Sequence, residues 1–204
     1  MDALKQTWGR IHDWLAANCP IVLGSFGPPA TDEQFGEAER AMGVELPEEV
    51  KAVYRIHDGQ RHIPTPVSYC PDLKCIPAFL WGEDWLGLKD MTRRWKGVKE
   101  LLDGGTFDGT KGEPRGPVRS DWWHPGWLPL TEDHSGYMRC LDLAPKSRGH
   151  AGQVIFWCHD SPERGVLAPN LPAWLEQFAM ALEQGEFTSV PDKYGPGLIR
   201  VRDL

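Results

Sequence analysis

The sequence has no apolar run that approaches the length of a membrane-spanning helix. Its first residues, MDALKQTWGRIHDW, also lack the uninterrupted apolar stretch of a signal peptide. Basic residues are not in excess, because the formal net charge is -7. Binders of nucleic acid or of anionic membranes need a basic surface, so neither class of function is expected. We therefore predict a soluble cytoplasmic protein.

Patterns for disulfides, metals and phosphate are missing as well. The five cysteines are an odd number and are scattered, which does not suggest a disulfide framework. Cys70 and Cys75 have no second cysteine pair, and no His-x-x-x-His spacing occurs. The stretch GGTFDGTKGE lacks the Gly-Lys-Ser/Thr ending of a phosphate-binding loop. We expect no cofactor, no metal and no enzymatic activity.

Two chemical alternatives stay open. A metal-dependent enzyme would use the region of Asp133, His134, Asp142 and His159. Cys158 and His159 are a nucleophile next to a base, but adjacent residues of a strand point to opposite faces and cannot form a hydrogen-bonded pair there. Cys140 is expected across from Cys158, which would make two buried thiols.

Several stretches have the apolar spacing of helices. In residues 2–18, the stripe of Leu4, Trp8, Ile11 and Leu15 fits a helix that packs on its own domain or binds a partner. Further helices are predicted over 31–43, 47–59, 91–103 and 171–185.

The first two of these further helices form a predicted hairpin. Thr31 and Gln34 have the spacing of a capping box, and Gly43 suits a left-handed cap at the end of the helix. Pro47 fits the first turn of the next helix. We expect this helical hairpin to cover the strands that follow it.

Residues 121–160 contain three short apolar runs, WLPLT, YMRCLDL and QVIFWCH, each bounded by turn residues. This pattern predicts an antiparallel meander of three strands. Asp142 falls on one strand face with Met138 and Cys140, so its carboxylate must be hydrogen-bonded or face an opening. The fold class predicted is α+β, with a central antiparallel sheet flanked by helices and residues 1–204 in a single domain.

Other segments are less regular. A strand is possible in CIPAFLWG, between prolines, and residues 104–120 read as a mobile surface loop. The tail 186–204 is a carboxyl-terminal extension in which Leu198, Ile199 and Val201 fit a short edge strand.

Ten tryptophans are many for 204 residues. Large aromatic residues near carboxylates suit a cationic partner surface, where rings supply binding energy and acids steer the encounter. The candidate partner-binding residues are Trp81, Glu83, Asp84, Trp85, Asp121, Trp122 and Trp123. The alternative is that most of these rings are core, since large aromatic residues are usually buried.

Three segments together resemble a known family. They are PPATDEQFGEAERAMGVELPEEVKAVYRIHDGQ, WLPLTEDHSGYMRCLDLAP and GQVIFWCHD, in that order. The chain is similar over residues 28–183 to the SUKH superfamily, in the group named after the fungal Smi/Knr regulator of cell-wall glucan synthesis. Matching positions, mostly structural, are Gly43, Leu46, Pro47, Asp58, Gly59, Trp127, Pro129, Asp142, Gly152 and Gln153. The chain departs from the family pattern at Gly136-Tyr137 and in its long, Trp-rich 60–125 region.

The resemblance implies an α+β fold without catalytic machinery. The resemblance and the residues together leave three hypotheses for the function. The first is an immunity protein that neutralises a toxin domain, such as a basic nuclease that an acidic inhibitor would suit. The second is an intracellular scaffold or regulator of cell-wall synthesis. The third is the metal-dependent enzyme described above. The partner's identity, the binding face and the oligomeric state are left open.

Overall fold

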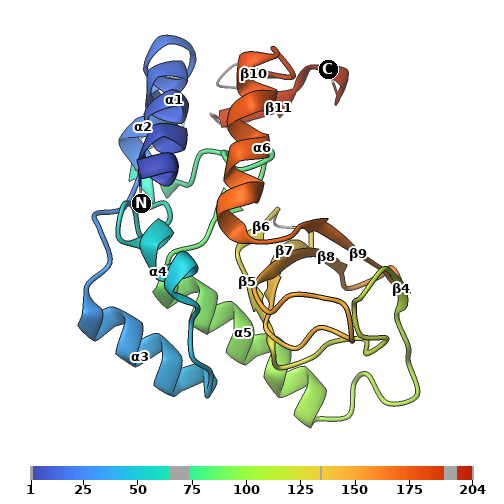
Figure 1. Cartoon of the computed structure of the whole chain (residues 1–204). Helices are drawn as coiled ribbons and strands as arrows, with labels where there is room; N and C mark the ends of the chain where they lie inside the picture. Colours follow the sequence, from blue (N-terminus) through green and yellow to red (C-terminus); the bar gives the residue numbers. More distant parts are fainter. Residues whose placement is uncertain (1, 65–73, 134, 191–196, 204) are drawn as a thin grey trace.

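The computed structural model of the chain describes residues 2–64, 74–133, 135–190 and 197–203 (Figure 1). Its helices are α1 (Asp2–Asn18), α2 (Pro20–Ser25), α3 (Asp32–Met42), α4 (Glu48–Tyr54), α5 (Leu88–Asp103), α6 (Leu171–Glu183) and the 3-10 helix η2 (Val201–Asp203). Its strands are β1 (Ile63–Pro64), β2 (Lys74–Cys75), β3 (Asp84–Trp85), β4 (Glu113–Arg115), β5 (Trp127–Pro129), β6 (Thr131–Glu132), β7 (Tyr137–Asp142), β8 (Gln153–Cys158), β9 (Glu163–Ala168), β10 (Phe187–Val190) and β11 (Gly197–Arg200).

The predicted α+β class is confirmed, and the predicted strands lie mainly in a five-stranded sheet. This sheet has the order β4-β9-β8-β7-β5. Strands β5, β7 and β8 form the expected antiparallel meander, with one additional antiparallel strand, β9, beside β8. The run WLPLT is divided between β5 and β6, and β6 leaves the main sheet to pair with β3.

The expectation of an all-antiparallel sheet is wrong at one edge. Strand β4 lies in the segment predicted as a mobile loop, and it pairs with β9 in parallel. The residues Glu113, Pro114 and Arg115 remain partly or fully exposed. An edge strand needs backbone pairing on only one side and no apolar alternation, so the Gly- and Pro-rich sequence gave no signal for it.

The pairing of β7 with β8 shows that the prediction that Cys140 lies across from Cys158 is wrong. Cys140 pairs with Ile155, and Cys158 pairs with Tyr137. The two cysteines therefore lie at different positions along the strands, because the register is set by the turns at the ends of the hairpin.

The helices cover the sheet in a different arrangement from the one expected. Helices α5 and α6 pack on the sheet, whereas α3 packs mainly on α5, and α1 and α4 pack mainly on α6 (Figure 1). The buried hydrophobic residues of all these helices and of the sheet form one cluster, which extends from Trp8 to Leu198.

The ends of the predicted helices differ in a few places. The capping box is present, because Thr31 Oγ1 accepts from the Gln34 N–H at 3.2 Å and Gln34 Oε1 accepts from the Thr31 N–H at 2.8 Å. Gly43 ends α3 with a φ of 67°. Helix α4 stops at Tyr54, before the predicted end at Gly59, and α2 was not predicted.

Two of the less regular segments contain short paired strands. In CIPAFLWG the structure has β2 and isolated bridges at Ala78 and Leu80 in place of a continuous strand. In the tail, Leu198 and Ile199 lie in β11, which pairs with β10 to form an antiparallel hairpin, while Val201 begins η2.

The Asp58-Gly59 turn joins three segments of the chain. Asp58 Oδ1 accepts a hydrogen bond from the Leu88 N–H at 2.7 Å and so caps the start of α5. Gly59 has a φ of 63°, and a Cβ atom there would lie 2.1 Å from the backbone nitrogen of Gly87. Gly27 N–H in turn donates to the Gly59 carbonyl at 2.9 Å. The absence of side chains at these glycines allows the backbones to meet.

We predict that Gly59→Ala lowers the free energy of unfolding by at least about 2 kcal/mol, because the new methyl group adds strain at positive φ and overlaps the Gly87 backbone. Gly97→Ala is the matched control, since Gly97 is in α5 and has no heavy atom within 4 Å of an added Cβ. It should raise stability by about 0.5–1 kcal/mol through helix propensity. Urea unfolding followed by circular dichroism measures both, and a neutral Gly59→Ala would contradict the role of the junction.

Two histidines join α1 to the segment after α4. His12 Nε2 lies 2.9 Å from His57 Nε2, and His57 Nδ1 lies 3.1 Å from the Gly27 carbonyl oxygen. Nδ1 of His57 therefore carries the proton that this carbonyl accepts, and its Nε2 accepts from His12. Burial lowers the pKa of both rings, since a charged imidazole is poorly solvated there.

This pair predicts a pH dependence of stability. Because the folded-state pKa values are below the ordinary value of 6.5, the unfolded chain binds more protons in that range. Stability should be complete above about pH 6.5 and should fall as the pH is lowered through that value and below. Urea unfolding between pH 7.5 and 5 should show a smaller decline in the His12→Gln/His57→Gln double variant. The exposed His150→Gln control should retain the full decline; equal pH dependence in all three proteins would refute the assignment.

Candidate functional site

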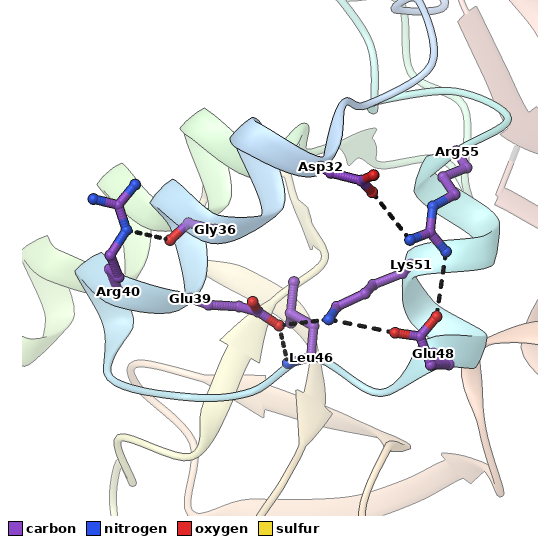
Figure 2. Close-up of polar contacts among 8 residues, drawn as sticks. All are labelled: Asp32, Gly36, Glu39, Arg40, Leu46, Glu48, Lys51 and Arg55. Carbon is purple, nitrogen blue, oxygen red and sulfur yellow. Dashed lines mark hydrogen bonds and ion pairs between the residues drawn. The ribbon is translucent and has the colours of Figure 1, made fainter.

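The α3–α4 hairpin is held by a network of charged side chains (Figure 2). Glu39 Oε1 accepts from the Leu46 N–H at 2.8 Å and from Lys51 Nζ at 2.9 Å. Glu48 contacts both Lys51, at 3.4 Å, and Arg55, at 3.3 Å. Figure 2 shows Glu39 of α3 pointing toward Lys51 of α4, with Glu48 between Lys51 and Arg55 on the α4 side. Through Glu39, the network connects the end of α3 to Leu46 in the link and to Lys51 of α4.

Asp142 is fully buried at the end of β7 and is hydrogen-bonded as its position on the strand required. Its Oδ1 accepts from the Ala144 N–H at 2.9 Å, and its Oδ2 accepts from Gln153 Nε2 at 2.9 Å. Burial is the main cause that raises the pKa of Asp142, and these hydrogen bonds oppose the shift. The neighbouring motif residue Gly152 has a φ of 97° and lies against Glu49 of α4.

Trp127 and Pro129 complete the motif positions on the sheet. Both are buried on β5, where Trp127 pairs with Asp142 and Pro129 pairs with Cys140. The motif residues on the sheet therefore meet at the packed end of the β5–β7–β8 meander rather than at an open site.

Most of the predicted partner-binding residues lie inside the molecule. Glu83, Asp84, Trp85 and Trp123 are buried. The ring of Trp85 stacks on Trp8 at 5.3 Å in the core. These four side chains cannot contact a partner in this conformation, whereas Trp81, Asp121 and Trp122 remain partly exposed.

The buried Glu83 has partners that compensate its charge. Its Oε2 accepts from Thr131 Oγ1 at 2.5 Å, and its Oε1 forms an ion pair with Arg139 at 2.8 Å. Burial raises the pKa of Glu83, and the Arg139 charge and the Thr131 hydroxyl oppose this. The carboxylate is thus part of the packing between β6, β7 and the segment before β3.

Trp122 is positioned by a buried arginine that the sequence analysis did not single out. The Arg164 guanidinium lies 5.0 Å from the Trp122 ring and 5.6 Å from the Trp157 ring. It donates to the carbonyl oxygens of Trp122 at 2.8 Å and of Ser161 at 2.6 Å. Burial lowers the pKa of Arg164 to about 10. This clamp ties the Asp121-Trp122 segment to β9.

Only some of the residues suggested for a metal-dependent enzyme lie close together in the fold. Asp133 and His159 lie near the turn between β7 and its neighbours, but Asp142 lies at the opposite end of β7. His134 falls outside the described residues. Among the described residues, Cys158, His159 and Asp160 are the group whose ligand atoms could hold a metal, all lying within 4.8 Å of one another. The chain bends after β8, so Cys158 and His159 are closer than an extended strand would allow.

The chemistry of Cys158 does not favour a nucleophile. Its thiol donates to Asp160 Oδ1 at 2.6 Å. Burial, with added repulsion from Asp160, raises the pKa of Cys158, so the neutral thiol is favoured over the reactive thiolate. Cys140 is fully buried, and burial raises its pKa as well.

An open groove of about 890 Å³ runs between α3 and α5. It is lined by Gln34, Glu37, Ala38, Ala41, Leu88, Lys89, Thr92, Arg93, Lys96, Gly97 and Glu100. A helix was predicted over 91–103, but no local pattern pairs it with α3, because the groove requires these two helices to pack against each other. In the part of the chain that the structure describes, none of the helices is sufficiently long and apolar to cross a membrane.

We predict that Asp142→Ala lowers the free energy of unfolding by about 2 kcal/mol, since it leaves Gln153 and the Ala144 N–H without their buried acceptor. The control is Asp103→Ala, which removes a surface pair with Lys99 and should change stability by less than about 0.5 kcal/mol. Thermal and urea unfolding measure both. If Asp142→Ala were as stable as the native protein, this carboxylate would not be needed for folding, and a functional role would be favoured instead.

Comparison with known proteins identifies the family. Residues 29–177 match the SMI1/KNR4 family (SUKH-1). The cell wall assembly regulator SMI1 of Saccharomyces cerevisiae is 26% identical over 225 residues, covering 94% of this chain and 43% of the yeast protein. The cell wall biosynthesis/cell cycle regulator smi1 of Schizosaccharomyces pombe is 26% identical, covering 95% of this chain and 40% of its own. The glucan synthesis regulatory protein of Neurospora crassa is 25% identical, covering 90% and 39%. The chain thus spans about two fifths of the length of these relatives, and it belongs to the SMI1/KNR4 family (SUKH-1).

Proposed function

We propose that this chain is a non-enzymatic protein-binding domain that acts in the regulation of cell-wall glucan synthesis. The observation that carries the proposal is the family match over 29–177, together with relatives named as regulators of cell-wall assembly and glucan synthesis. These names favour the second hypothesis from the sequence over the first. The immunity-protein hypothesis receives no support from the relatives described above.

The way the fold uses its polar groups supports a binding role. Internal hydrogen bonds and ion pairs occupy the polar groups of Asp142, Glu83 and Arg164. The neutral thiol is favoured at Cys158. The Cys158 thiol is hydrogen-bonded to Asp160, but it is held neutral, whereas a transfer reaction would need the thiolate. Surface recognition is therefore the activity that the exposed groups support best.

We assign partner contact to the Asp121-Trp122 segment. Trp122 is partly exposed, and its ring is held by Arg164 from within. A rigid aromatic ring loses little side-chain entropy on binding and gains apolar area, which is the character of interface hot spots. Asp121 forms a surface ion pair with Arg119 at 2.7 Å, so the segment also has charged groups at its rim.

A domain exchange tests the proposed function. In the Saccharomyces cerevisiae relative, the matching segment would be replaced by residues 1–204 of this chain. The chimera should restore growth of a strain without that regulator on a dye that perturbs the cell wall. A Gly59→Ala chimera, destabilised at the junction, should restore growth less well. An abundant, folded chimera that fails to restore growth would refute a shared regulatory role.

A paired variant tests the assigned surface. Asp121→Ala/Trp122→Ala should weaken capture of the partner found in a quantitative pull-down by at least about tenfold, as expected for a central aromatic contact. The chain offers a matched control in Asp13→Ala/Trp14→Ala, the same dipeptide on α1 with a partly buried ring. Thermal unfolding of each variant separates lost binding from lost folding. Equal capture by both folded variants would exclude this segment as the contact.

A further inference from the structure

A second, smaller cavity lies where the carboxyl-terminal hairpin meets α6 and the sheet. Its volume is about 250 Å³, and it is lined by Trp81, Arg139, Leu167, Trp174, Gln177 and Arg200. These residues come from the turn before β3, from β7, β9, α6 and β11. Figure 1 shows β10 and β11 beside α6, and Arg200 belongs to β11. Segments that are distant in the sequence therefore build one small site.

Two guanidinium groups line this cavity. Arg139 uses Nη2 for its ion pair with Glu83, at 2.8 Å, while its Nη1 is buried and has no hydrogen-bond partner among the described residues. The Arg200 guanidinium lies 4.9 Å from the centre of the Trp81 ring and 5.5 Å from that of Phe187. Within the described residues, no carboxylate forms an ion pair with Arg200.

Nearby carboxylates compensate the charge of Arg200 only in part. Burial, followed by the positive charge of Arg202, lowers the pKa of Arg200, and Arg139 adds to this effect. Glu186 and Asp203 oppose this shift. Two cations close together in a partly enclosed space attract an anion more strongly than either does alone.

Trp81 adds two independent observations. Its backbone has a φ of 60°, which is unusual for a bulky residue and costs free energy, as is common at binding sites. Its indole Nε1 is also buried without an acceptor among the described residues. The ring stacks on Trp174 at 6.3 Å. The Trp81 ring, held by a backbone at positive φ, thus lines the same cavity as the two arginines.

We propose that the cavity formed by Trp81, Arg139 and Arg200 binds one oxyanion, a carboxylate or phosphate carried by a side chain of the partner protein. The volume is below the range of about 300–1,000 Å³ that is usual for drug-sized ligands, so a single side-chain head group fits better than a whole metabolite. Guanidinium groups bind such oxyanions through charge-assisted hydrogen bonds, and the indole rings can cover the aliphatic part of the side chain. The partner as carrier rests on the proposed function, but the oxyanion site can be tested without it.

The first test titrates the ¹⁵N-labelled full chain with three probes: N-acetyl-phosphoserine amide, N-acetyl-aspartate amide and inorganic phosphate. Nuclear magnetic resonance follows the indole N–H signal of Trp81, assigned by its loss in Trp81→Phe. We expect saturable shifts of this signal, with the phosphorylated side chain binding more tightly than aspartate. N-acetyl-serine amide, which has no charge, should give none. Tighter binding of inorganic phosphate than of phosphoserine would overturn the assignment to a side chain.

Matched arginine variants complete the test. Arg200→Gln should weaken phosphoserine binding about tenfold, since it removes a charged donor. Arg202→Gln removes the same charge from an exposed neighbour that does not line the cavity, and it should change binding less than twofold. Thermal unfolding confirms that both variants fold. If both variants bound phosphoserine equally weakly, general charge attraction would explain the binding, and the proposed site would be overturned.

The outcome can be separated from that of the proposed function. If the native chain captures its partner but the Trp81 signal does not respond to any probe, the oxyanion site is wrong and the binding function stands. If the probes bind at Trp81 and Arg200→Gln leaves partner capture unchanged, the cavity binds oxyanions, but the partner is not their carrier and the proposal fails in that part.

Discussion

The close meeting of backbones at Asp58 and Gly59 is the constraint on which the rest of the fold depends. Asp58 caps the first turn of α5, and Gly59 lies directly against Gly87, so the end of the α3–α4 hairpin sets where α5 begins. Because α5 packs on the sheet and α3 packs on α5, this junction also sets how the hairpin is placed relative to the strands. A side chain at Gly59 would separate these layers, which gives the Asp-Gly motif a physical reason.

Several charged and aromatic residues lie in the interior, although their residue types alone would place them at a surface. Arg164 lies between two indole rings and donates to backbone carbonyls, and Glu83 is neutralised by Arg139. Each buried charge needs such partners, since an uncompensated charge in a protein interior is costly. The recognition that we propose therefore uses groups that are left partly exposed, at Trp122 and around Trp81.

Local patterns predicted local structure well. The capping box at Thr31, the left-handed cap at Gly43 and the three apolar runs of the meander all depend on residues within one or two turns of each other. Predictions failed where distant pairing decides. Strand β4 has no strand-like sequence and exists because β9 offers it an edge, and the position of Cys158 opposite Tyr137 follows from register rather than from composition.

The sequence by itself determined the α+β class, the helical hairpin, the meander and the family resemblance, because turn chemistry and apolar periodicity are encoded within short segments. Only the tertiary structure decided which of the tryptophans are core and which reach a surface, since burial depends on segments far apart in the chain. The same holds for the cavity of Trp81, Arg139 and Arg200, which lie on three elements separated by more than half of the sequence. Long-range packing, which has no local signature, brings those charges together.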